Sequence, residues 1–89
     1  MGWRRWPGFA DYKLDGYEVM GFGAAIRLMK GGERVSREGW NDKVWVALQL
    51  PDEHSKMGAP YFYISTVSGK LVPWLPNQAD LLADDWKVL

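Results

Sequence analysis

The sequence predicts an α+β domain, built from a small antiparallel sheet with short helices. Two observations support this fold class. The chain has 89 residues, which is the size of a single domain. Apolar residues recur first with helical spacing and then with the alternation typical of strands, before a capped helix and a last short strand. The expected order is helix, strand, strand, β-hairpin, helix and strand, at residues 21–30, 33–37, 43–50, 61–72, 77–83 and 86–89.

The composition is unusually aromatic for so short a chain. Hydrophobic residues make up 47%, with 6 Trp, 4 Tyr and 3 Phe, which is more aromatic area than a small monomer easily buries. We therefore expect a homo-oligomer, a large aromatic binding surface, or both. The absence of cysteine excludes disulfides, thiolate zinc sites and a cysteine nucleophile.

Charge and hydropathy narrow the class of partner. Eleven basic and eleven acidic residues give zero net charge, which argues against the broad positive field that attracts nucleic-acid polymers. A discrete pocket for a small anion stays open. No apolar run approaches the roughly 20 residues that cross a bilayer, so no membrane association is expected. A soluble, cytoplasmic protein is the resulting expectation.

Residues 1–19 carry aromatic and basic side chains without a sustained helical or strand period, and Pro7-Gly8 interrupts any early element. Two interpretations stay open for this segment. It is either a basic, aromatic arm that touches a nucleotide or a partner subunit, or an accessory extension that packs on the surface. Met20 directly precedes the first patterned segment. We therefore expect an extension at 1–19 and the folded domain at 20–89.

The first helix and the turn after the next strand are read from local pattern. Phe22, Ile26 and Met29 form one apolar stripe, and Gly31-Gly32 ends the predicted helix of about nine residues. After the strand at 33–37, Trp40 lies between Gly39 and Asn41, in a stretch of turn-forming residues. A tryptophan on a bend is either a ligand platform or a hydrophobic lid.

The middle strands are apolar on both faces, at residues 43–50 and 61–66, so each needs cover on both sides. The intervening loop at 51–60 contains His54, which has no nucleophile or second ligand nearby and is interpreted as a solvated residue. Ser68-Gly69 predicts a tight hairpin turn, and Pro73 ends the second hairpin strand or marks a sheet edge.

The stretch at 71–86 is the most specific part of the chain. Pro73 and Pro76 bracket Trp74 and hold the backbone extended, which fixes the direction of the indole. Asn77 is well placed as a helix N-cap, with Asp80 as the acidic partner of a capping box. A fixed aromatic followed by polar groups suits a base stacked on the indole. The same pattern is typical of a tryptophan pinned in a core, and spacing alone favours that second interpretation.

Two carboxylates follow this helix, at a position where the helix dipole disfavours negative charge. Either the helix has ended by Ala83 and Asp84 and Asp85 are solvated, or one carboxylate is kept to accept hydrogen bonds from hydroxyls or an amino group.

Several motifs together resemble one small family, the phage Thoeris anti-defence proteins of the second type. The resemblance covers residues 20–89, in the same order and at compatible spacing. The motifs are Met20-Gly21-Phe22-Gly23-Ala24-Ala25, Lys30-Gly31-Gly32, Val35-Ser36-Arg37-Glu38-Gly39-Trp40-Asn41, Val72-Pro73-Trp74 through Gln78, Asp80-Leu81-Leu82-Ala83 and Asp85-Trp86.

The resemblance implies a protein that binds and sequesters a cyclic signalling nucleotide without cleaving it. In that family the nucleotide is a glycocyclic ADP-ribose made by a bacterial immune enzyme, and some relatives also bind cyclic dinucleotides of a second immune system at a separate site. Family members are homotetramers with pockets between subunits. The resemblance thus implies no enzymatic activity, cofactor or metal, and action in the cytoplasm of the infected host.

Site residues also follow from the resemblance. Trp40 and Trp74 match the tryptophans of the family motifs and are candidates for stacking on adenine. Asn41, Gln78 and Asp80 are candidate polar readers. Apart from the resemblance, the basic residues near these tryptophans are the available phosphate partners, namely Arg34, Arg37, Lys43 and Lys70, and Arg37 is the expected one. Most of the four are expected to be solvated charges at a sheet edge. The central loop at 51–60 is shorter than in some relatives, so contacts made by that loop do not carry over.

Two other function classes stay open. A nucleotide hydrolase would use Asp80, Asp84 or Asp85 with a metal, although the chain lacks a histidine cluster or repeated carboxylate spacing. An interaction module or single-strand binder would use the N-terminal aromatics with Arg4 and Arg5.

Overall fold

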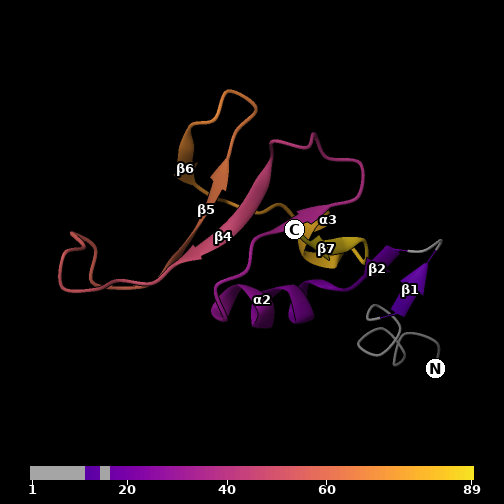
Figure 1. Ribbon diagram of the computed structural model, residues 1–89, viewed down its shortest axis with the longest axis horizontal. Helices are drawn as coiled ribbons and strands as arrows, with labels where there is room; N and C mark the ends of the chain where they lie inside the picture. The colour runs from indigo at the N-terminus through magenta and orange to yellow at the C-terminus, as the bar shows by residue number, and fades with distance from the viewer. Residues whose placement is uncertain (1–11, 15–16) are drawn as a thin grey trace.

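Seven strands and two helices make up the part of the chain that the structure, a computed structural model, describes, namely residues 12–14 and 17–89 (Figure 1). None of these helices has the length and apolarity that crossing a membrane requires. The elements are β1 (Tyr12–Leu14), β2 (Tyr17–Val19), α2 (Phe22–Lys30), β3 (Val35–Arg37), β4 (Trp45–Gln49), β5 (Tyr61–Ser65), β6 (Leu71–Pro73), α3 (Gln78–Leu82) and β7 (Trp86–Val88).

The main sheet has five antiparallel strands in the order β6-β5-β4-β3-β7. The last strand of the chain therefore lies beside β3 and not beside β6, which directly precedes it among the strands. Val35 of β3 is opposite both Val46 of β4 and Val88 of β7. This arrangement confirms the predicted α+β class with a small antiparallel sheet, whereas the oligomeric state stays a prediction.

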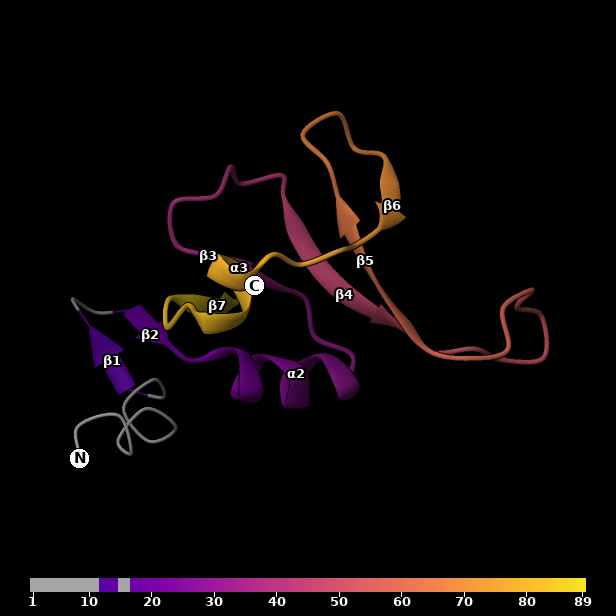
Figure 2. The same ribbon diagram turned by 180° about the vertical axis from the view of Figure 1, so that it is seen from behind.

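Helix α2 has the predicted length of nine residues and ends at the predicted glycine pair. It runs along the main sheet on the side of β3 and β7 (Figures 1 and 2). Ala25 and Met29 of this helix are fully buried. The core is formed by Met20, Ala25, Met29, Val35, Val46 and Trp86.

Residues 1–19 were expected to lack a sustained strand pattern, but the structure has two short strands within them, β1 and β2. β1 and β2 pair as an antiparallel hairpin, and the Asp15-Gly16 pair between them is a sequence signal for such a turn. Met20 and Trp86 exchange two backbone hydrogen bonds, of 2.9 and 3.0 Å. Residues 1–11 of the expected arm, with Arg4 and Arg5, lie outside the described residues, and the domain boundary at Met20 stays a prediction.

The second face of the sheet carries aromatic side chains, as the two-sided apolar pattern predicted. Trp45 of β4 packs edge-to-face on Tyr63 of β5, with ring centres 5.9 Å apart. The guanidinium of Arg34 lies 4.6 Å from the centre of the Trp45 ring. Near the β6 edge, a shallow groove of about 160 Å³ is lined by Gln49, Tyr61, Tyr63, Leu71, Val72 and Pro73.

Both predicted connections in the middle of the chain are confirmed. Residues 51–60 form a loop that projects from the sheet at the end away from β1 and β2 (Figures 1 and 2). The His54 side chain in this loop is 85% exposed, as expected for a solvated residue. The β5–β6 hairpin closes where the N–H of Thr66 donates to the carbonyl of Lys70 at 2.8 Å.

Candidate functional site

Three indoles from separate segments meet beside α2. Trp86 is fully buried, and both Trp40 and Trp74 pack on it edge-to-face, with ring centres 5.3 and 5.9 Å away. The ring centre of Phe22 in α2 lies 5.8 Å from that of Trp74 and 5.3 Å from that of Trp86. The structure therefore brings together the two tryptophans that the sequence singled out. Each is half-buried, so each ring is held by packing and keeps part of its surface accessible.

The position of Trp40 is set by a tight turn after β3. Gly39 adopts φ +94°, a left-handed conformation that favours glycine. The N–H of Trp40 donates to the carbonyl of Arg37 at 3.0 Å. The side-chain oxygen of Asn41 accepts a hydrogen bond of 2.8 Å from the N–H of Lys43. Asn41 is thus exposed but uses its side-chain oxygen to close the turn.

The position of Trp74 is set by the end of the sheet. Its N–H donates to the carbonyl of Phe62 at 3.0 Å, which continues the ladder between β5 and β6 by one residue. The Phe62 and Trp74 rings pack edge-to-face with their centres 6.2 Å apart. The segment between β6 and α3 is therefore attached to the sheet, and the predicted proline bracket surrounds a tryptophan that also has core contacts.

The predicted capping box at the start of α3 is confirmed. The side-chain oxygen of Asn77 accepts a hydrogen bond from the N–H of Asp80 at 2.8 Å, and the Asp80 carboxylate accepts one from the N–H of Asn77 at 3.4 Å. Gln78, a candidate polar reader, is exposed on the first turn. The helix ends with Ala83 as its C-cap, as predicted.

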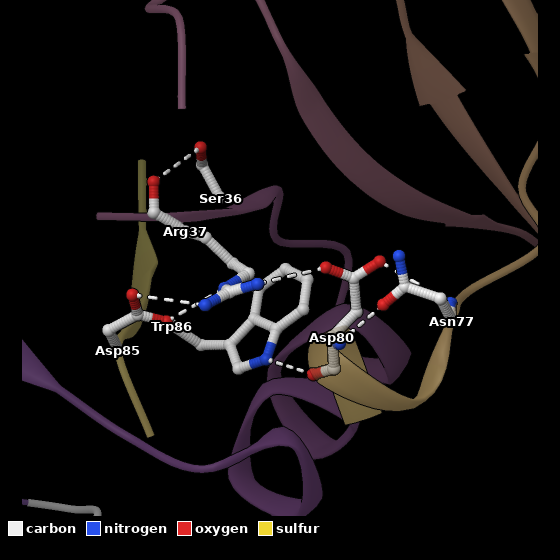
Figure 3. Close-up of polar contacts among 6 residues, drawn as sticks. All are labelled: Ser36, Arg37, Asn77, Asp80, Asp85 and Trp86. Atoms are coloured by element: carbon white, nitrogen blue, oxygen red, sulfur yellow. Dashed lines mark hydrogen bonds and ion pairs between the residues drawn. The ribbon is translucent and has the colours of Figure 1, made fainter. Parts of the chain in front are cut away.

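Arg37 links two carboxylates beside the indole of Trp86 (Figure 3). Its Nε donates to Oδ1 of Asp85 at 2.9 Å, and its Nη1 donates to Oδ1 of Asp80 at 3.0 Å. Asp80 is buried, with 8% of its surface exposed. The hydrogen bond to Asp85 is the main cause that raises the pKa of Arg37, although burial acts in the opposite direction.

The acidic pair that follows α3 matches each of the two interpretations only in part. Asp85 accepts hydrogen bonds, and its donor is the guanidinium of Arg37 in the same chain. Asp84 lies at the surface, and its pKa is raised first by partial desolvation of its carboxylate and second by the charge of Asp85. One carboxylate is therefore held by hydrogen bonds and the other lies at the surface.

Sequence reasoning missed the central role of Trp86. It was expected only as the first residue of the last strand, yet it is the ring on which the two candidate tryptophans pack. Its partners lie 46 and 12 positions earlier in the chain, beyond the range of local pattern. The acidic residue before it did carry a signal, because Asp85 follows a helix end where negative charge is disfavoured.

The candidate phosphate partners lie at different places. Arg34 stacks on Trp45 at the aromatic second face of the sheet, while Arg37 is engaged by two carboxylates. Lys43 and Lys70 are exposed, and Lys43 lies in the turn that follows Trp40 in the connection between β3 and β4. Lys43 is thus the candidate that combines an exposed side chain with a position close to one tryptophan.

A metal-dependent hydrolase would need a metal site, and residues 12–14 and 17–89 contain no cluster of side chains that forms one. Within these residues, no three His, Asp or Glu side chains are close enough together to hold a metal ion. Moreover, Asp80 and Asp85 are already paired with Arg37, and a metal would have to compete with that cation.

Comparison with known proteins identifies the family. Residues 20–89 match the Thoeris anti-defense 2-like domain. A protein named Thoeris anti-defense 2, from Bacillus phage SP01, is 32% identical over 84 residues, and the match covers 79% of this chain and 94% of that protein. The chain therefore belongs to the Thoeris anti-defense 2-like family of phage anti-defence proteins.

Proposed function

We propose that this protein binds and sequesters a cyclic immune nucleotide of the glycocyclic ADP-ribose type, without cleaving it, inside the infected bacterial cell. The observation that carries the proposal is the placement of Trp40 and Trp74. The two rings come from separate turns, pack on the same buried Trp86 and are both half-buried. Membership in an anti-defence family supports the same function.

The physical case rests on aromatic stacking. A base stacked on an aromatic ring contributes about 1–3 kcal/mol, so two rings contribute about 2–6 kcal/mol. Nanomolar binding needs about 12 kcal/mol, and charge-assisted hydrogen bonds supply the remainder when the site is already formed. Packing on Trp86 supports such a preformed site, because it fixes both rings before the ligand arrives.

Polar and charged contacts are assigned by position. Asn41 directly follows Trp40, and Gln78 lies four residues after Trp74; both are exposed. We assign them to the edges of the base or to ribose hydroxyls. Asp80 is a weaker candidate, since its carboxylate already accepts hydrogen bonds from Arg37 and Asn77. Lys43 is the proposed phosphate partner.

We further propose that the protein acts as a homo-oligomer, and the family resemblance implies that this oligomer is a tetramer. Large apolar side chains near the indole cluster support this part of the proposal. Leu75 directly follows Trp74 and is 90% exposed, and Leu82 at the end of α3 is 70% exposed. Burial of such residues by a second copy would contribute about 1.5–3 kcal/mol for each leucine that becomes fully covered.

Calorimetry with a cyclic ADP-ribose isomer, together with tryptophan fluorescence, tests the proposal. We expect a saturable heat and a change in emission, and linear ADP-ribose serves as the control for cyclic shape. Heating the complex should release the intact cyclic compound, as measured by mass spectrometry. A cleaved product would instead establish the hydrolase alternative, and the absence of heat and of any emission change with all cyclic nucleotides tested would overturn the proposal.

Deletion of residues 1–19 separates the proposal from the interaction-module alternative. Under the proposed function the shortened chain keeps most of its nucleotide affinity, because Trp40 and Trp74 lie in the remaining domain. Loss of all binding after this deletion, with the circular dichroism of the folded domain retained, would favour the module.

A further inference from the structure

Arg37 joins the three chain segments that carry the indoles. Its own backbone carbonyl accepts the N–H of Trp40 at 3.0 Å. Its side chain reaches Asp80 in the first turn of α3, six residues after Trp74, and Asp85, the residue before Trp86. Arg37 therefore contacts the turn of Trp40 through its backbone carbonyl, and its guanidinium connects the helix that follows Trp74 with the residue before β7. Figure 3 shows the two contacts of the guanidinium.

Other hydrogen bonds tie the same segments together. The indole N–H of Trp86 donates to the backbone carbonyl of Asp80 at 3.0 Å. The N–H of Glu38 donates to the backbone carbonyl of Asp85, also at 3.0 Å. Asp80 is thus held through its carboxylate by Arg37 and through its carbonyl by Trp86. A shift of either group moves α3 relative to the indole cluster.

The charge balance at Arg37 disfavours direct contact with a phosphate. One guanidinium charge faces two carboxylates at 2.9 and 3.0 Å, and its side chain is only 24% exposed. A phosphate that reached this cation would have to approach both carboxylates or displace one of them, and like charges at such distances repel. The planar fork of arginine is suited to bridging two carboxylates, and the point charge of lysine is not.

We infer that Arg37 is a positioning residue that controls nucleotide binding through Trp40 and Trp74, by means of its ion pairs with Asp80 and Asp85, and does not itself hold the phosphate. The inference rests on the proposed function for its effect on affinity. Its effect on the geometry of the ligand-free protein does not depend on that function, and the two are measured separately.

Asp85→Asn is the decisive variant, because the two roles of Arg37 predict opposite signs. If Arg37 held the phosphate, removing its competing carboxylate would strengthen binding of a cyclic ADP-ribose isomer. If Arg37 positions the indoles, binding weakens by on the order of tenfold, since a small misplacement of binding groups is costly. Asp84→Asn is the matched control. It removes the same charge at the neighbouring position, where the side chain is exposed and is not paired with Arg37.

Near-UV circular dichroism of the ligand-free full chain supplies the second measurement, since it reports the mutual orientation of the aromatic rings. Asp85→Asn and Arg37→Lys are both expected to change the tryptophan signal, whereas Asp84→Asn leaves it as in the wild type. Far-UV spectra and thermal denaturation establish that each variant is folded.

The outcomes are distinguishable. Binding by Asp85→Asn as tight as, or tighter than, binding by Asp84→Asn overturns the inference, as does an unchanged tryptophan signal in Asp85→Asn and Arg37→Lys. If the wild-type protein binds no cyclic nucleotide, the proposed function fails. The near-UV comparison of ligand-free variants then still decides whether Arg37 positions the indoles.

Discussion

The indole N–H of Trp86 donates to the backbone carbonyl of Asp80 at 3.0 Å, in the buried interior beside α2. This bond joins the last strand to a helix of only five residues. So short a helix is not stable by itself in water, because nucleation costs more than a single turn returns. Helix α3 therefore depends on its tertiary contacts, and the indole N–H of Trp86 provides one of them. The ring of the same Trp86 is the one on which Trp40 and Trp74 pack.

Trp86→Phe tests this dependence. The variant keeps an aromatic ring but removes the indole N–H, so the buried carbonyl of Asp80 keeps only the longer hydrogen bond of 3.4 Å from the N–H of Ala83. The loss of one such hydrogen bond costs about 0.5–1.5 kcal/mol of unfolding free energy. Urea denaturation measures the loss. Trp45→Phe is the control, because Trp45 is half-buried on the second face of the sheet. Equal stability of the two variants would contradict the assigned role of the indole N–H.

Replacing either candidate platform is expected to weaken nucleotide binding. Trp40→Leu and Trp74→Leu each keep apolar volume but remove the stacking surface, which costs about 1–3 kcal/mol, or roughly 5- to 150-fold in Kd. Calorimetry with a cyclic ADP-ribose isomer gives the measurement. Trp45→Leu should bind as the wild type does, since Trp45 packs on Tyr63 away from the cluster. Loss of affinity in Trp45→Leu alone would place the site on the second face of the sheet.

The capping box gives a prediction for stability. Asn77→Ala removes the side-chain acceptor for the N–H of Asp80 and is expected to cost about 1 kcal/mol. For a domain of this size that corresponds to a decrease in Tm of about 4–8 °C. Gln78→Ala, at the neighbouring exposed position, should leave Tm nearly unchanged. A Tm for Asn77→Ala equal to that of Gln78→Ala would show that the cap does not stabilise α3.

Two glycines with open space around them should respond in opposite directions to alanine. Gly39 has φ +94° and Gly23 is the second residue of α2, and a Cβ added at either would lie in open space. Gly39→Ala is expected to destabilise by about 1–2 kcal/mol through backbone strain. Gly23→Ala is expected to stabilise by about 0.4–1 kcal/mol, because it reduces the conformational freedom of the unfolded chain. Thermal denaturation of the two variants checks the signs, and stabilisation by Gly39→Ala would rule out the turn conformation described for Trp40.

Asp84 gives a prediction for pH dependence. Its pKa is raised above the ordinary value of 3.8, first by burial and second by Asp85. Between 3.8 and the raised native pKa the folded protein binds more protons than the unfolded chain, so the free energy of unfolding falls as pH rises through this window. Asp84→Asn should therefore be more stable than the wild type at pH 7, and equal to it at pH 3. Because Asp84 is exposed, the gain is about 0.5 kcal/mol or less.

Urea denaturation at both pH values measures the difference between Asp84→Asn and the wild type. Asp42→Asn, which removes an exposed carboxylate in the turn after Trp40, serves as the control and should give no gain. A difference that persists at pH 3 would show that the effect of Asp84→Asn does not arise from its charge.

Local pattern was enough to predict much of the fold. The stripe of Phe22, Ile26 and Met29, the glycine stop after it and the capping box of Asn77 all act within one or two helical turns, so their consequences are written in neighbouring residues. The hairpin at Ser68-Gly69 is local in the same way. The hairpin of β1 and β2 also had a local signal, at Asp15-Gly16, which the aromatic and basic composition of residues 1–19 obscured.

The sequence by itself indicated candidate binding residues, whereas the tertiary structure decided what these residues contact within the chain. Spacing indicated Trp40 and Trp74 but left open whether they pack in a core or face a ligand. In the structure each tryptophan packs on Trp86 and is only half-buried. Arg37 and Asp85 are 48 positions apart. They meet only because the chain after β6 returns to the opposite edge of the sheet, where β7 pairs with β3. Strand order depends on the global burial of apolar surface, and no short stretch of sequence encodes it.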